Sequence, residues 1–203
     1  MNQIENLKKI VKSKLTKNDP AHDFEHIMRV YRNAERICKN ENGNKKLILS
    51  AVLLHDVIKI KNRNDSALKS AQLSKKILKE NYFLDDEITI IFNAIKEHSF
   101  SKGKLPSTIE GKILQDADRL DAIGAIGLAR VFSFSGSNNR PFYDPKDPFS
   151  KNRNLNDNKW ALDHFYEKLL FVEGKMNTKT GKLLAKKRTK ILKNFLKEIK
   201  NEI

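Results

Sequence analysis

The sequence predicts an all-α protein, and three observations carry this prediction. Apolar residues recur with the i, i+3, i+4 and i+7 spacing of amphipathic helices along most of the chain. No pair of segments shows the alternating pattern of strands. Histidines and aspartates stand at dispersed positions inside otherwise apolar helical stretches. The chain has 203 residues, of which 39% are hydrophobic, so we expect one well-filled core and a single domain over residues 1–203.

The apolar periodicity predicts a succession of helices. They are expected near residues 2–16, 23–40, 45–59, 65–81, 85–98, 107–133, 158–173 and 178–201. Asp23 and Asn44 stand where N-caps are expected, just before the second and third of these helices. Ser107 and Glu110 have the spacing of a capping box, which predicts a further helix start there.

Residues 134–156 interrupt the helical pattern. The stretch FSGSNNRPFYDPKDPFSKNRNLN contains three prolines, five asparagines and a glycine. A connection of this length inside a compact domain is usually a lid, a binding loop or a disordered segment. Its aromatic residues argue against disorder. We therefore expect a folded loop over the active site, with Arg140 and Tyr143 contacting the substrate, followed by C-terminal helices over 158–201.

The formal net charge of +15 has a simple explanation in the lysines. Lysine supplies 31 of the 40 basic residues and arginine 9, and the lysines are scattered through nearly every predicted helix. Such a distribution is typical of a solvated surface, whereas nucleic-acid binding favours a concentrated basic stripe. Nucleic acid is therefore a less favoured partner, although the charge attracts polyanionic small molecules such as nucleotides.

The sequence also bears on location. No apolar run approaches the about 20 residues that span a bilayer. The N-terminal stretch MNQIENLKKIVKSKL lacks the apolar region of a secretory signal. The single cysteine, Cys38, excludes an internal disulfide and falls in the middle of a predicted helix. We expect a cytoplasmic protein with no membrane partner.

Four polar side chains on apolar helical segments are candidate metal ligands. They are His26 in HDFEHIMRV, His55 and Asp56 at the end of LILSAVLLHD, and Asp118 in QDADRLDAIG. Each of them alone has a structural explanation, since a lone histidine on an apolar face is more often a core residue. Together they form a set of two imidazoles and two carboxylates, which suits manganese, magnesium, cobalt, nickel, iron or zinc. Such a site activates a phosphoryl group toward attack by water.

Further acidic and basic residues flank the last of these motifs. Asp118 and Asp121 are three residues apart and share a helix face, whereas Asp116 points elsewhere. Arginine is suited to bidentate contacts with phosphate, and Arg29 and Arg119 lie within the motif segments. For these two arginines, ion pairs with the motif aspartates explain the placement equally well.

On these residues the chain resembles the HD-domain superfamily of metal-dependent phosphohydrolases, and in particular its compact bacterial branch. The similarity covers roughly residues 20–190. Its segments follow in the same order: HDFEHIMRV, LLHD, EHSF, QDADRLDAIGAIGLAR, RPFYDP, HFYEKLL and MNTKTGKLLAKKR. The resemblance implies a single HD-domain helical bundle, with the metal motifs in a core of about residues 20–130.

The resemblance also implies a chemistry. It assigns one divalent ion, usually manganese, to four ligands: His26, His55, Asp56 and Asp118. It further implies hydrolysis of nucleoside triphosphates to monophosphates and pyrophosphate. Many superfamily members place an acidic residue a few positions after the His-Asp pair, whereas this chain reads HDVIKIKNRND. Lys59 and Lys61 stand in that window and are expected to contact substrate phosphates.

The general base is left open by this departure, with Asp121, His22 and His98 as candidates beside Asp56 in the catalytic set. His98 ends a predicted helix, where a phosphate contact and a purely structural role are equally favoured. His164 is more typical of a core or supporting position. An alternative function is a non-enzymatic or regulatory HD-domain protein that binds nucleotide or nucleic acid. The sequence is compatible with a homodimer.

Overall fold

The computed structural model describes the chain except for residues 1, 16–22, 59–62 and 100–104. Over the described residues the fold is all-α, as predicted, and contains no strand. The α-helices and two short 3₁₀ helices are α1 (Gln3–Lys14), α2 (Phe24–Cys38), α3 (Lys45–Leu54), α4 (Arg63–Glu80), α5 (Asp85–Glu97), α6 (Ile109–Asp121), α7 (Gly124–Ser137), α8 (Ala161–Glu167), η2 (Leu169–Phe171), η3 (Glu173–Lys175) and α9 (Lys179–Glu202). None of these helices is both long and apolar enough to cross a membrane.

The chain divides into two compact units. Unit 1 consists of Met1–Asp118 with Asn177–Gly181, and unit 2 of Arg119–Met176 with Lys182–Ile203. The expected single domain over residues 1–203 stays a prediction.

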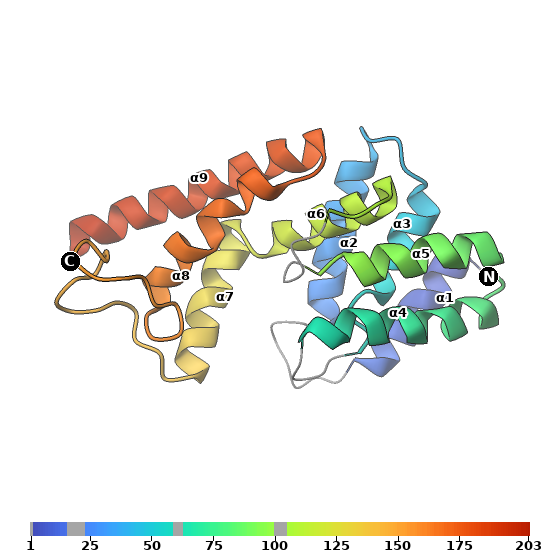
Figure 1. The fold of residues 1–203 in the computed structure, drawn as a ribbon, viewed down its shortest axis with the longest axis horizontal. Coiled ribbons are helices and arrows are strands. Elements are labelled where there is room, and N and C mark those ends of the chain that lie inside the picture. The colour runs from blue at the N-terminus through green and yellow to red at the C-terminus, as the bar shows by residue number, and fades with distance from the viewer. Residues whose placement is uncertain (1, 16–22, 59–62, 100–104) are drawn as a thin grey trace. The chain divides into compact units, whose positions relative to one another are not determined.

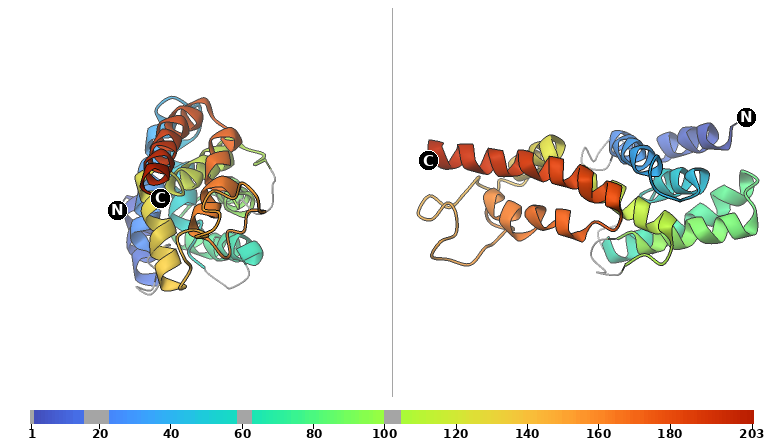
Figure 2. Two further views of the ribbon diagram at one scale, coloured as in Figure 1. Left: turned by 90° about the vertical axis from the view of Figure 1, so that its left-hand side faces the viewer. Right: turned by 90° about the horizontal axis from the view of Figure 1, so that it is seen from above.

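Unit 1 is built around α3. This helix packs against α1, α2 and α5, and α4 lies along α5 (Figures 1 and 2). Every residue of α3 from Leu47 to Leu54 is buried. A helix that is apolar on all sides belongs at the centre of a helical bundle. The His55–Asp56 pair follows directly on α3, so it lies at the C-terminal end of the central helix of this unit.

Two of the N-caps predicted for helices of unit 1 are present in the structure, and the predicted capping box is not. Asp23 accepts a hydrogen bond from the His26 backbone N–H at 2.8 Å, and Asn44 accepts one from Leu47 at 3.3 Å. The predicted capping box at Ser107 is wrong, because Thr108 Oγ1 accepts the hydrogen bond from Gly111. Both the N–H and the hydroxyl of Ser107 instead donate to Glu97.

The helix predicted over 107–133 is two helices. Gly124 starts α7 at φ 80°, in the left-handed region that favours glycine. A Cβ atom at this glycine would lie 3.0 Å from the side chain of Arg188. The Arg188 guanidinium donates to the backbone carbonyl of Leu120, in the last turn of α6. The break thus coincides with a left-handed glycine and with a contact from α9, and the local sequence pattern does not contain that contact.

In unit 2, aromatic residues join three helices. Phe132 of α7, Phe165 of α8 and Phe195 of α9 have ring centroids 5.6–6.1 Å apart. The helix predicted over 158–173 is shorter than expected, since α8 ends at Glu167 and the 3₁₀ turns η2 and η3 follow. The last predicted helix, over 178–201, corresponds to α9.

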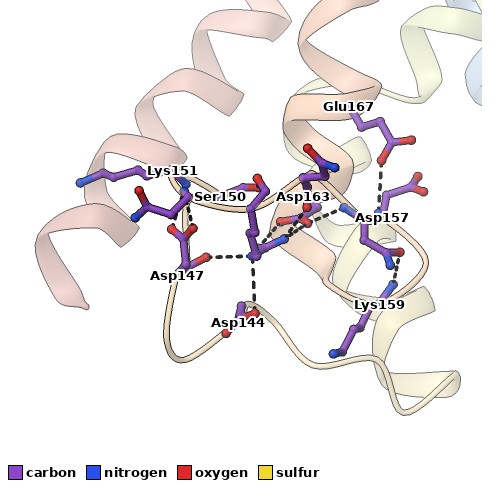
Figure 3. Close-up of polar contacts among 12 residues, drawn as sticks. Asp144, Asp147, Ser150, Lys151, Asp157, Lys159, Asp163 and Glu167 are labelled. Atoms are coloured by element: carbon purple, nitrogen blue, oxygen red, sulfur yellow. Dashed lines mark hydrogen bonds and ion pairs between the residues drawn. The ribbon is translucent and has the colours of Figure 1, made fainter.

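The proline-rich connection is a folded loop over residues 138–160. It begins later than the predicted residue 134, because Ser135 bonds back to the Val131 carbonyl and receives the guanidinium of Arg140, which completes the last turn of α7. Figure 3 shows the polar contacts that hold the loop together. Arg153 forms two hydrogen bonds with Asp163 of α8, at 2.5 and 2.9 Å.

Candidate metal centre

His26 enters the centre from the first turn of α2. The Asp23 cap fixes the start of this helix, and the His26 side chain is 2% exposed. Its Nε2 atom lies 3.6 Å from Asp118 Oδ1 on α6. The apolar neighbours Ile27 and Val30 are fully buried on the same helix, so core packing of α2 brings the imidazole inward.

His55 enters from the C-terminal end of α3 and is fully buried. Its Nδ1 atom lies 2.7 Å from the backbone carbonyl of Val52. A carbonyl only accepts hydrogen bonds, so the proton sits on Nδ1 and the lone pair on Nε2. Burial lowers the pKa of His55, which keeps the imidazole neutral. Nε2 has no hydrogen-bond partner among the described residues and lies 3.9 Å from Asp118 Oδ1.

These three residues form a cluster that fits a divalent ion. The ligand atoms of His26, His55 and Asp118 all lie within 4.8 Å of one another. Ligands about 2.1 Å from a common ion are about 3–3.5 Å apart, so the observed separations of 3.6 and 3.9 Å are close to a binding geometry. A neutral imidazole whose second nitrogen donates to a carbonyl is the usual arrangement of a histidine ligand. Two nitrogens and a carboxylate oxygen suit the borderline divalent metals.

A second cluster shares His55 with the first. Ligand atoms of His55, Asp56 and His98 also lie within 4.8 Å of one another. His98 follows α5 as His55 follows α3, and its Nδ1 lies 2.5 Å from the carbonyl of Ile95, three residues earlier. The His55 and His98 rings meet edge to face, with centroids 5.0 Å apart. From the sequence, His98 was expected as a general base or a phosphate contact and not as a metal ligand.

The other aspartates of α6 are engaged elsewhere. Asp121 is buried, and its Oδ2 lies 2.9 Å from the Nη1 of Arg130. Asp116 is fully buried and accepts hydrogen bonds from Asn177 and Thr178. Asp116 and Asp118 thus differ in surroundings, as the predicted difference in helix face requires.

The predicted substrate contacts are spread over the chain. Arg29 is half-buried on α2 in unit 1. Arg119 belongs to unit 2, where it donates to the Lys175 carbonyl. Arg140 and Tyr143 also lie in unit 2, and Arg140 bonds Ser135 and the Asp157 carbonyl. Three residues predicted for the site lie outside the described residues: His22, Lys59 and Lys61.

His164 has a supporting place in unit 2. Its Nδ1 lies 2.8 Å from Asp157 Oδ2, and Asp157 is also bonded by Lys168. Burial lowers the pKa of His164 and outweighs the hydrogen bond to Asp157, which raises it. This surrounding agrees with the expected supporting position.

Comparison with known proteins assigns the arrangement to a family. The sequence-family model of the HD domain matches residues 23–123, a range that contains both side-chain clusters. YpgQ of Bacillus subtilis is 33% identical over 208 aligned positions, which cover 100% of this chain and 95% of YpgQ. The chain belongs to the HD-domain superfamily. The predicted resemblance is therefore confirmed.

Solved structures share the fold of this HD-domain protein. An HD-superfamily hydrolase from Bacillus thuringiensis has a TM-score of 0.80 and 34% identity, with 98% of this chain and 96% of that protein covered. YpgQ of Bacillus subtilis in complex with ADP has a TM-score of 0.77 and 32% identity, with 99% and 95% covered. The protein thus has the fold of HD-superfamily hydrolases.

Proposed function

We propose that this HD-domain protein is a metal-dependent phosphohydrolase that converts nucleoside triphosphates to monophosphates and pyrophosphate. The observation that carries the proposal is the cluster of His26, His55 and Asp118, whose ligand atoms lie within 4.8 Å of one another. Asp56, which follows His55, is the proposed fourth ligand, and manganese is the proposed metal. A divalent ion held by these residues supplies Lewis-acid polarisation of a phosphoryl group and lowers the pKa of bound water.

The two histidines His55 and His98 are proposed to have different roles. The Nδ1–H of His55 donates a hydrogen bond to the Val52 carbonyl, which holds the ring in one orientation with Nε2 toward Asp118. His98 is the proposed proton acceptor, since its Nδ1 is held by the Ile95 carbonyl and its Nε2 keeps a lone pair. This geometry favours His98 over Asp121, whose carboxylate is engaged by the guanidinium of Arg130.

A nucleotide substrate is supported by two observations. The relative YpgQ binds ADP in its crystal structure. The net charge of +15 attracts polyphosphates. The basic and aromatic residues proposed to contact the substrate are Arg29, Lys59, Lys61, Arg119, Arg140 and Tyr143. Attack at the α-phosphorus, with pyrophosphate as the leaving group, follows from the resemblance to the bacterial branch.

Hydrolysis of a panel of nucleoside mono-, di- and triphosphates with added Mn²⁺ tests the activity. We expect triphosphates to be cleaved, and oxygen-18 from labelled water to enter the nucleoside monophosphate. Label in orthophosphate would mean γ-cleavage and would overturn the cleavage position. A protein that binds nucleotides but hydrolyses none would instead be the regulatory alternative.

A matched pair of variants ties the activity to the centre. Asp118→Asn keeps the shape of the side chain and removes the charge, so we expect hydrolysis to be lost. Asp85→Asn makes the same change on α5, where the carboxyl group is 92% exposed, and should leave hydrolysis unchanged. Equal activity of the two variants would separate the activity from Asp118.

The proposal includes a cytoplasmic location and a homodimer. The location carries forward the expectation from the sequence, and the homodimer is proposed as an assembly with which the sequence is compatible. Cell fractionation tests the location, and light scattering of the purified chain tests the dimer. A secreted protein or a monomer at all concentrations would contradict these two points.

A further inference from the structure

Asp116 is a buried carboxylate that the proposed chemistry does not use. It lies two residues before Asp118 on α6 and is 0% exposed. Residues two apart on an α-helix point about 200° away from each other, so Asp116 faces away from the side on which Asp118 meets the histidines. A charged group in this position requires compensation by hydrogen bonds.

Residues 177 and 178, just before α9, supply that compensation. Asp116 Oδ1 accepts from the backbone N–H of Asn177 at 2.8 Å and from its Nδ2 at 2.9 Å. Asp116 Oδ2 accepts from the backbone N–H of Thr178 at 2.8 Å and from its hydroxyl at 2.7 Å. Thr178 Oγ1 in turn accepts from the N–H of Gly181 at 2.9 Å, in the first turn of α9. One carboxylate therefore fastens α6 to the segment Asn177–Gly181.

Gly181 shows how closely this segment approaches Asp116. A Cβ atom at this position would lie 2.4 Å from Asp116 Oδ2 and 2.7 Å from Thr178 Oγ1. Neither oxygen can move away without giving up its hydrogen bonds within this segment. Glycine is therefore required here by the close approach of the carboxylate and not by a left-handed backbone.

The two neighbours of Asp116 are fastened to other elements of the same unit. Gln115 Nε2 donates to the carbonyl of His98 at 3.2 Å, and its Oε1 accepts from Asn177 at 3.0 Å. Asn33, on the helix of His26, donates to the carbonyl of Ala117 at 3.0 Å. The three residues that precede Asp118 are thus held by the end of α5, by the segment Asn177–Gly181 and by α2.

We propose that Asp116 is a positioning residue of the metal centre, which holds Asp118 at its distance from His26 and His55 through the segment Asn177–Gly181. The inference rests on the proposed function, since it presumes that Asp118 is a metal ligand. It assigns a role to the MNTKTG stretch, which contributes no ligand of its own. Release of Asp116 lets α6 turn or shift, and the ligand set then loses its spacing.

Thr178 offers a sharp test, because Thr178→Val removes the hydroxyl group and keeps the methyl group, whereas Thr178→Ser keeps the hydroxyl group and removes the methyl group. Metal-free full-length protein is titrated with Mn²⁺, and free Mn²⁺ is followed by its electron paramagnetic resonance signal. Thr178→Val and Asp116→Asn should weaken Mn²⁺ binding about 10-fold or more, as loss of groups that orient metal ligands does. Thr178→Ser keeps the hydroxyl and should bind within about twofold of the wild type.

Asp163→Asn is the matched control for stability. Asp163 is also a buried carboxylate, 1% exposed, but it belongs to the loop contacts of unit 2. This variant should lower the melting temperature in chelator without changing the Mn²⁺ dissociation constant. The d–d absorption spectrum of Co²⁺-loaded protein adds a second readout, which should change in Thr178→Val and not in Asp163→Asn.

The outcomes separate the two proposals. A wild-type protein without saturable Mn²⁺ binding would overturn the proposed function, and the positioning role with it. A wild type that binds Mn²⁺, together with Thr178→Val that binds equally well, would overturn the positioning role alone. Should Asp116→Asn fail to fold, the comparison of Thr178→Val with Thr178→Ser still decides, because both keep Asp116.

Discussion

Replacement of Arg153 by alanine should destabilise unit 2 and open the loop over residues 138–160. Arg153 supplies two of the hydrogen bonds that Asp163 accepts, and the third comes from the N–H of Asn156 at 2.7 Å. The Asp163 side chain is 1% exposed, whereas that of Arg153 is 20% exposed. Removing the arginine therefore leaves a buried carboxylate with most of its compensation lost.

The expected loss of unfolding free energy follows from this difference in exposure between the two side chains. Loss of one partner of a buried ion pair costs about 3–5 kcal/mol, and the partial exposure of Arg153 admits water, so we expect about 2–4 kcal/mol for Arg153→Ala. For a chain of this size, this corresponds to a decrease of roughly 4–16 °C in melting temperature. Asp163→Asn should cost less, because the guanidinium that it leaves behind is partly solvated and the amide oxygen still accepts from Asn156.

The single tryptophan makes the assay local. Trp160 immediately precedes α8, and its backbone N–H donates to the carbonyl of Asn156, so its fluorescence reports unfolding of this region. Urea unfolding followed at Trp160 gives the change in free energy, and limited proteolysis reports opening of the loop. An Arg153→Ala variant within about 0.5 kcal/mol of the wild type, the range of ordinary surface substitutions, would refute this account of the loop.

Three further predictions concern single groups. Burial raises the pKa of the Asp157 carboxyl, but hydrogen bonds from Lys168 and His164 outweigh it and leave that pKa below its usual value, while the pKa of His164 is also lowered. The free energy of unfolding should therefore fall as pH decreases below about 6.5, where unfolded His164 gains a proton, and fall again near 4, where unfolded Asp157 does. His164→Gln should remove the first decrease. Burial raises the pKa of the Cys38 thiol to about 11, so thiol reagents at pH 7 should modify it far more slowly than free cysteine and leave hydrolysis unchanged. Arg140→Ala should raise the KM for a triphosphate more than it lowers kcat, and steady-state kinetics that show an unchanged KM would contradict a role of this loop in substrate binding.

The sequence predicted those features that depend on local pattern. The apolar run before His55 predicted a buried helix, and α3 is such a helix, although it ends at Leu54 and not near the predicted residue 59. The cap at Asp23 and the inward placement of His26 followed from the same reasoning. These features require only the periodicity of one helix and the chemistry of its ends.

Features that depend on distant contacts could not be predicted from the sequence. The partners of Asp116 lie 61 and 62 residues further along the chain, and no local pattern links them. His98 joins His55 and Asp56 because α5 packs against α3, which is a tertiary fact. The contact of Arg188 with the Leu120 carbonyl, at the break between α6 and α7, likewise comes from a remote element. In each case a side chain meets a backbone group or a ring from a remote element.

The Mn²⁺ content of the purified chain after dialysis tests the central claim most directly. Wild-type protein should retain a stoichiometric amount of Mn²⁺, measured by mass spectrometry of the metal, and should be stabilised by it against thermal unfolding. Asp56→Ala, with the same dialysis, should retain no Mn²⁺ and hydrolyse no nucleotide. An Asp56→Ala protein that binds Mn²⁺ stoichiometrically with unchanged affinity would contradict the assignment of the metal centre to the His-Asp motif.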